Sequence, residues 1–154
     1  MVLAITAVAL SVWAVIRSGS PSDPAATGHT ATQFDEAERS AATQRVCEAF
    51  ETVRRGVSLN TNATAPGGAQ DVAGGLAVAA NARLALFGGG EYLLARIGPA
   101  TPDDLAQASR NFAETLLDIG ATSISGVPTT HPEQAERLRI AEEQSAAVAE
   151  QCEG

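Results

Sequence analysis

The chain has 154 residues and a net charge of −8, and all ten of its basic residues are arginine. This charge argues against nucleic acid as a partner, since phosphates require a basic patch, and against electrostatic docking on anionic lipid. Aromatic residues make up only 4% of the chain, so a core must be built from Ala, Leu and Val, which favours closely packed helices over a β-sandwich.

The first sixteen residues carry no charged side chain, and this apolar run ends at Arg17. A helix that is apolar on every face is not stable alone in water. The run falls between the core of a signal peptide, about 7–15 residues, and a spanning helix of about 20. No basic residue precedes it, and Trp13 and Arg17 stand at one end as interfacial anchors would. We predict a retained transmembrane anchor over 1–17, with a cleaved signal or a buried helix as the alternatives.

Both membrane interpretations carry the rest of the chain across the bilayer. We therefore expect a single-pass protein of the cell membrane with an extracytoplasmic C-terminal domain. Arg17 by itself favours the opposite orientation, so we expect a charged cytoplasmic segment upstream of Met1. Residues 18–30 are rich in Ser, Pro and Gly and predict a flexible linker, and residues 31–154 predict the folded domain.

Helical periodicity then recurs four times. The first helix is predicted to begin at Thr32, because Asp35 completes a capping box, and to end in the turn-forming residues 60–68. The second, over about 70–97, is the most apolar, and Gly88-Gly89-Gly90 predict either a break or a very close helix contact. The apolar positions of these two helices are Val46, Phe50, Val53, Val57, Val72, Leu76, Ala80, Leu84, Phe87 and Leu94.

The third helix has a clear start signal, with Thr101 as the N-cap and Pro102 in the first turn, and it ends at 126–128. The fourth begins near the capping-box pattern of 130–133. Their inward positions are predicted to be Leu105, Ala108, Phe112, Leu116, Ile119, Leu138, Ala141, Ser145, Val148 and Cys152. Short connections favour an antiparallel four-helix up-down bundle.

Two cysteines lie on the first and last predicted helices. Antiparallel neighbours in such a bundle can bring Cys47 and Cys152 together, and disulfides persist outside the cytosol. We predict a disulfide, with two free core thiols as the alternative. A catalytic Cys–His pair is disfavoured, because neither His29 nor His131 has an orienting carboxylate at motif spacing.

The sequence contains no pattern typical of an enzyme. Two distant histidines and two distant cysteines make no metal site, a phosphate-binding Walker loop needs a lysine that the chain lacks, and no G-x-S-x-G elbow occurs. We therefore predict no catalytic residues, no metal and no cofactor.

Polar residues of the second helix are the candidates for a contact site. Arg83 and Glu91 are two helical turns apart and can share a face with Asn81. They form either a structural ion pair or solvent-facing stripe, or a contact point for a ligand or partner helix. The complete candidate site is Asn81, Arg83, Gly88, Gly89, Gly90, Glu91 and Tyr92.

Several segments resemble a family of uncharacterised, alanine-rich, membrane-anchored proteins of mycobacteria and related actinobacteria. The resemblance covers roughly residues 45–152 and rests on residues 46–50, 57–62, 76–94, 99–105, 112–120 and the terminal Cys152. It implies an anchor preceded by a cytoplasmic arm and carries no activity. We therefore expect an envelope-facing accessory or interaction protein that contacts another envelope protein. The alternative is a module that binds a lipid or small apolar ligand between its helices.

Overall fold

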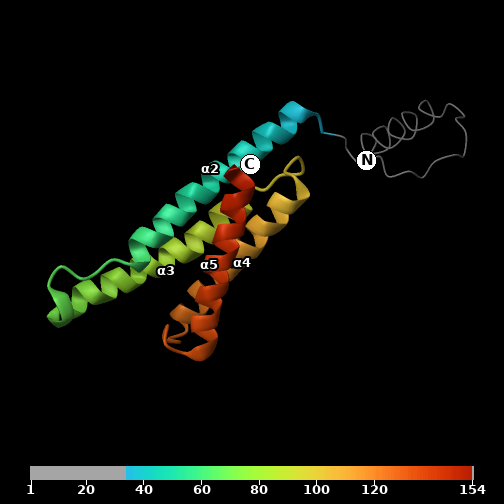
Figure 1. Cartoon of the computed structure of the whole chain (residues 1–154). Helices are drawn as coiled ribbons and strands as arrows, with labels where there is room; N and C mark the ends of the chain where they lie inside the picture. The colour runs from blue at the N-terminus through green and yellow to red at the C-terminus, as the bar shows by residue number, and fades with distance from the viewer. Residues whose placement is uncertain (1–33, 154) are drawn as a thin grey trace, which may run out of the picture. The chain divides into compact units, whose positions relative to one another are not determined.

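The computed structural model describes residues 34–153, so the predicted anchor at 1–17 and linker at 18–30 lie outside the described residues. The described part is all-helical, which confirms the predicted class of fold, and consecutive helices run antiparallel (Figure 1). Its elements are α2 (Glu36–Thr61), the 3-10 turn η1 (Gly68–Gln70), α3 (Val72–Leu94), α4 (Asp103–Ile124) and α5 (Pro132–Glu153).

The start of α2 is set by a capping box one turn later than predicted. The Asp35 carboxylate accepts a hydrogen bond from the backbone N–H of Glu38 at 2.7 Å, and the Glu38 carboxylate accepts one from Asp35 N–H at 2.9 Å. Asp35 is therefore the N-cap itself, and the prediction that it closes a box begun at Thr32 is wrong. The two motifs share a residue, which is why the sequence alone misplaced the boundary.

The start of α4 differs from its prediction by one residue. Pro102 is the N-cap, and Thr101 is buried one position earlier. The Thr101 hydroxyl accepts a hydrogen bond from Gly98 N–H at 3.1 Å and so closes the turn before the helix instead of capping the helix. Asp103 and Asp104 lie in the first turn, as predicted, where carboxylates favour the helix dipole.

The core lies where all four helices meet. Phe50 of α2 and Phe112 of α4 form an edge-to-face pair with ring centroids 5.6 Å apart, a favourable geometry for two aromatic rings. Around this pair lie the apolar side chains Val46, Ala49, Val53, Leu86, Leu93, Leu105, Ala113, Leu116, Ile119, Ala141 and Val148. The inward stripes predicted for the first and third helices are therefore largely confirmed.

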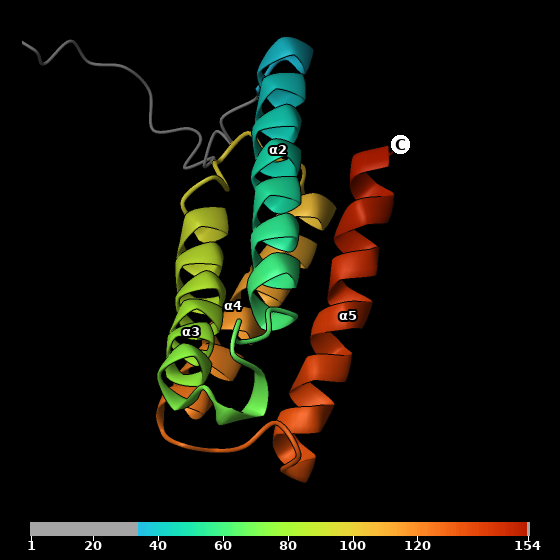
Figure 2. The ribbon, with the colours of Figure 1, turned by 90° about the vertical axis from the view of Figure 1, so that its left-hand side faces the viewer.

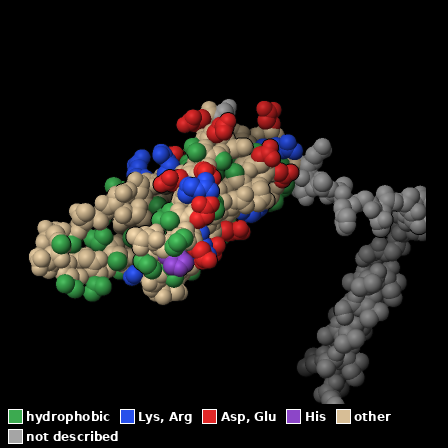
Figure 3. Space-filling view, turned by 60° about the horizontal axis from the view of Figure 1, so that its bottom comes forward, with side chains coloured by type: hydrophobic (Ala, Val, Ile, Leu, Met, Phe, Trp, Pro, Cys, Tyr) green, Lys and Arg blue, Asp and Glu red, His purple; other side chains and the backbone are tan. Residues whose placement is uncertain are grey.

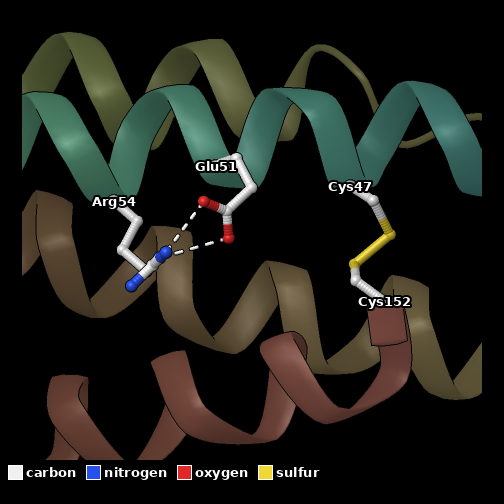
Figure 4. The surroundings of a disulfide bond; sticks show 4 residues. All are labelled: Cys47, Glu51, Arg54 and Cys152. Atoms are coloured by element: carbon white, nitrogen blue, oxygen red, sulfur yellow. Dashed lines mark hydrogen bonds and ion pairs between the residues drawn. A yellow bond between two sulfur atoms is a disulfide. The ribbon is translucent and has the colours of Figure 1, made fainter. Parts of the chain in front are cut away.

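A disulfide links the first and last helices of the described part, as predicted. Cys47 and Cys152 are 105 residues apart in sequence, and their Cα atoms are 5.6 Å apart. Figure 4 shows the bond running from the flank of α2 to the last turn of α5. Cys47 lies partway along α2, because α2 extends beyond the end of α5 (Figure 1).

The α2–α3 hairpin projects beyond the core at its looped end. The last buried residue of α2 is Val53 and the first of α3 is Leu86, so no residue from 54 to 85 is buried. Figure 1 shows this end of the hairpin separating from α4 and α5, and in Figure 2 the same end faces the viewer, with α4 behind α2 and α3. Half of the most apolar helix in the described part therefore lies outside the common core.

Candidate functional site

The three consecutive glycines of α3 do not break the helix, which is continuous from Val72 to Leu94. The predicted break is wrong, and the alternative of a very close helix contact is confirmed. Successive helical residues point about 100° apart, so the three glycines face three different surroundings. One faces α2, one faces α4, and one faces outward.

Two of these glycines are contact points between helices. A Cβ at Gly89 would lie 2.9 Å from Cγ1 of Val53 on α2. A Cβ at Gly90 would lie 2.8 Å from the backbone oxygen of Ala113 on α4 and 2.8 Å from Cγ of Leu117. Gly88 has no neighbouring atom within 4 Å of such a Cβ. Helix packing therefore explains why Gly89 and Gly90 are glycine. Gly88 contacts no neighbouring helix and stays exposed on the surface of α3.

An open groove of about 390 Å³ lies between α2 and α3 on the surface of the hairpin. It brings together Asn81, Gly88, Gly89 and Tyr92 of the candidate site, with Leu84 between them. The α2 side contributes Thr52, Val53, Gly56 and Asn60. The structure thus places part of the candidate set on one surface, because positions 81, 84, 88 and 92 repeat at helical spacing.

Arg83 lies on the opposite side of α3, in a second groove of about 450 Å³. This groove is bounded by the end of α2, the end of α4 and the following loop, and its polar lining includes Asn62, Ser123 and Thr129. Its apolar lining includes Leu86 and Ile119. Arg83 and Asn81 therefore do not belong to one site.

The structure does not pair Arg83 with Glu91. Within residues 34–153 the ion pairs join Arg54 to Glu51 and Arg139 to Glu136 and Glu143. Glu91 is exposed, and Tyr92 is stacked under the Arg96 guanidinium, whose carbon lies 4.4 Å from the ring centroid. Of the alternatives for Arg83 and Glu91, the ion pair is therefore not formed, and the end of α3 carries a cation–π contact between Arg96 and Tyr92.

The shifted pKa values lie away from both grooves that hold the candidate residues. A hydrogen bond from Arg54 lowers the pKa of the Glu51 carboxyl, and one from Arg139 lowers the pKa of the Glu136 carboxyl. Each pair is exposed and lies within a single helix at i,i+3 spacing. Such pairs contribute little to stability and are typical of solvated helix faces.

Sequence reasoning missed a buried polar contact between α4 and α5. Gln134 is 0% exposed. Its Nε2 donates to the Ile119 carbonyl and to Ser123 Oγ, both at 3.1 Å, and its Oε1 accepts from Thr122 Oγ1 at 2.6 Å. Only its spacing could have indicated that this glutamine faces inward, because position 134 lies about one, two and four helical turns before Leu138, Ala141 and Val148.

The second feature that sequence reasoning missed is the exposure of the apolar face of α3. Val72, Leu76 and Leu84 are 73%, 67% and 69% exposed. Within the described residues α3 alone is long and apolar enough to cross a membrane, and only 6% of its most apolar 18-residue window is buried. Hydrophobic side chains gather at the hairpin end in Figure 3, while most acidic ones lie over the rest of the domain.

Comparison with known proteins gave no match with any family model, curated protein or solved structure. Among residues 34–153 no three His, Cys, Asp or Glu side chains are grouped closely enough to hold a metal ion. The class that the fold defines is a disulfide-braced, all-helical domain with an apolar outer face on one helix.

Proposed function

We propose that this chain is a membrane-anchored, envelope-facing interaction protein of the actinobacterial family that its sequence resembles. Residues 1–17 form its single-pass anchor, and the helical domain lies outside the cytoplasm as an accessory part of an envelope complex. The uncharged N-terminal run supports the anchor. The Cys47–Cys152 disulfide supports an oxidising compartment. The proposal assigns the protein no catalytic step and no cofactor.

The observation that carries the interaction role is the exposed apolar face of α3. Between Arg55 and Arg83 the only charged residue is Asp71. Its carboxylate accepts hydrogen bonds from the backbone N–H groups of Gly74 and Gly67 and so serves the local turn. Large apolar patches left in water are costly and mark docking surfaces.

The proposal is tested by cross-linking the tagged full-length protein in native membranes, with three forms compared. Leu84→Arg places a charge on the apolar face, and Leu59→Arg is the matched control, because Leu59 on α2 is 68% exposed against 69% for Leu84. We expect specific proteins that are captured by the wild type and by Leu59→Arg but lost with Leu84→Arg. Capture that is equal for all three forms would contradict the proposal.

A second function is favoured by the groove around Arg83. An amphiphile with an anionic head group fits its chemistry, since one guanidinium stands beside apolar and hydroxyl-bearing side chains. Native mass spectrometry of the detergent-solubilised protein tests this alternative. We expect a lipid adduct that Arg83→Ala removes and that the control Arg55→Ala retains. An adduct independent of Arg83 would exclude this binding mode.

A further inference from the structure

One stripe of α3 has the spacing of a helix-pairing seam. Positions 73, 77, 80, 84, 87 and 91 follow one another at intervals of four and three residues, which keeps them on one side of the helix. All six are exposed, although Phe87 is only 37% exposed because one edge of its ring packs against Gly120 of α4. We define these positions as the α3 seam, whose members are Ala73, Ala77, Ala80, Leu84, Phe87 and Glu91.

The alanines and the larger residues of the α3 seam face one another when a second copy of the helix lies antiparallel to the first. When two copies of α3 lie antiparallel about a twofold axis near position 82, Ala80 faces Leu84 and Ala77 faces Phe87. Each bulky side chain then meets an alanine, as knobs-into-holes packing requires. A parallel pairing in register would instead set Leu84, Phe87 and Glu91 each against its own copy, with alanine opposite alanine at the other three positions.

The outermost pair of the seam adds electrostatic complementarity. In this register Glu91 faces Ala73, which lies in the first turn of the other α3 helix. The N-terminal end of a helix carries a partial positive charge and favours a carboxylate. The N-cap Asp71 already places one carboxylate at this end, on Gly74 N–H, and the first turn contains no further acidic residue, so Glu91 of the second copy would add a second carboxylate there.

We propose that the α3 seam binds the α3 seam of a second copy of this chain, antiparallel and about a twofold axis. The proposal deepens the proposed function, because it names the partner of the same apolar face. The seam is about 27 Å long at 1.5 Å per residue, and a single helix pair buries less than the roughly 800 Å² per partner of a standard interface. We therefore expect a reversible dimer that anchoring in one membrane strengthens by raising the effective concentration.

The composition of the α3 seam favours a protein helix over the bilayer surface as its binding partner. Helices that lie on a membrane present large apolar residues on one face and basic residues on the other. The N-terminal half of the α3 seam consists of three alanines and its C-terminal half of three larger residues, and α3 carries one arginine and no lysine. Alanine permits the close approach of a second helix and offers little area to lipid.

Sedimentation equilibrium of the full-length, oxidised protein in detergent tests the proposal. We expect the wild type and Leu59→Arg to show the same monomer–dimer equilibrium and Leu84→Arg to weaken it by roughly 30-fold or more. Unchanged helicity by circular dichroism verifies that each exposed variant is folded. A wild type that remains monomeric at a concentration on the order of 1 mM, or equal weakening by both arginine variants, would overturn the proposal.

The register is tested by mixing two variants that face one another only in the antiparallel pair. Ala80→Glu and Leu84→Arg each oppose self-association, and in a mixed dimer the new carboxylate meets the new guanidinium while the second Ala80–Leu84 contact stays native. We expect heterodimers in the mixture and monomers in each sample alone. A mixture that stays monomeric would exclude this register. Loss of a different protein in the membrane cross-linking, without any dimer, would leave the proposed function standing and remove the second copy as its partner.

Discussion

At the scale of single residues, close packing assigns different roles to chemically identical positions. Gly88, Gly89 and Gly90 cannot be distinguished in the sequence, yet one faces solvent and two contact neighbouring helices. Gly90 is buried against the backbone of α4, where no side chain can move aside to make room. The cost of three glycines in a helix is thus offset only where a neighbouring helix comes close.

This difference predicts opposite effects of the same substitution. Gly90→Ala forces its methyl group against the Ala113 carbonyl and should lower the free energy of unfolding by about 1–3 kcal/mol. Gly88→Ala meets no atom and should raise it by about 0.5–1 kcal/mol through helix propensity. Urea denaturation followed by circular dichroism measures both. Changes of the same sign in the two variants would contradict these helix contacts.

Gln134 shows how one buried side chain can fix a helix junction. Gln134→Leu should lower the free energy of unfolding by about 1–3 kcal/mol, because the Ile119 carbonyl and the Ser123 hydroxyl lose the hydrogen bonds that the buried Gln134 amide donates to them. The control is Gln107→Leu, which removes only an exposed i,i+4 hydrogen bond to Asn111 and should change stability by less than about 0.5 kcal/mol. Thermal and urea unfolding of the two variants are compared, and equal losses would refute a special role for Gln134.

At the scale of elements, α3 divides into two parts with different surroundings. Its C-terminal half contributes Leu86, Gly90 and Leu93 to the core, while its N-terminal half contributes no buried residue. The C-terminal end of α2, which runs beside it, likewise has no buried residue after Val53. Apolar composition was therefore a poor guide to burial in this helix, since the residues that gave α3 its apolar character are largely the exposed ones.

This division predicts uneven local stability along the hairpin. Backbone amides of residues 76–82 should exchange with solvent through a low-energy opening, and those of residues 90–94 only through global unfolding. Hydrogen exchange of the Leu84→Arg variant, in which the proposed dimer contact is disrupted, measures the two segments in one experiment by mass spectrometry. Equal protection along α3 would show that the looped end of the hairpin is as stable as the core.

At the scale of the whole domain, one covalent bond joins the first described helix to the last. The chain between Cys47 and Cys152 is long, so closing it removes much entropy from the unfolded state. Such a contribution is a large share of the 5–15 kcal/mol that stabilises an ordinary domain. The domain has few aromatic residues to stabilise it otherwise.

Removing the bond should lower stability more than the strain at Gly90 or the loss of the Gln134 contacts. The double variant Cys47→Ser with Cys152→Ser should lose about 4–5 kcal/mol of unfolding free energy through chain entropy. Reduction of the wild type with dithiothreitol should reach the same value, and the double variant should not respond to it. Free thiols at both positions in protein isolated from membranes, seen by non-reducing mass spectrometry, would contradict this picture.

The sequence by itself determined the helical class, the approximate extents of the four helices and the disulfide. These features depend on local periodicity, capping residues and the order of elements, all of which are present in a linear chain. The inward stripe of the third predicted helix was also readable, because Leu105, Phe112, Leu116 and Ile119 recur at helical spacing among polar neighbours. Helix starts were less certain wherever one polar residue could serve two adjacent motifs, as Asp35 and Thr101 do.

Only the tertiary structure decided which side of α3 is buried. That helix is apolar or small almost all round, so its own sequence contains no polar face to mark the solvent side. The buried side was decided by the neighbouring helices, since α2 packs closely against Gly89 and α4 against Gly90. The exposed residues of the α3 seam thereby became the surface on which the proposed function depends.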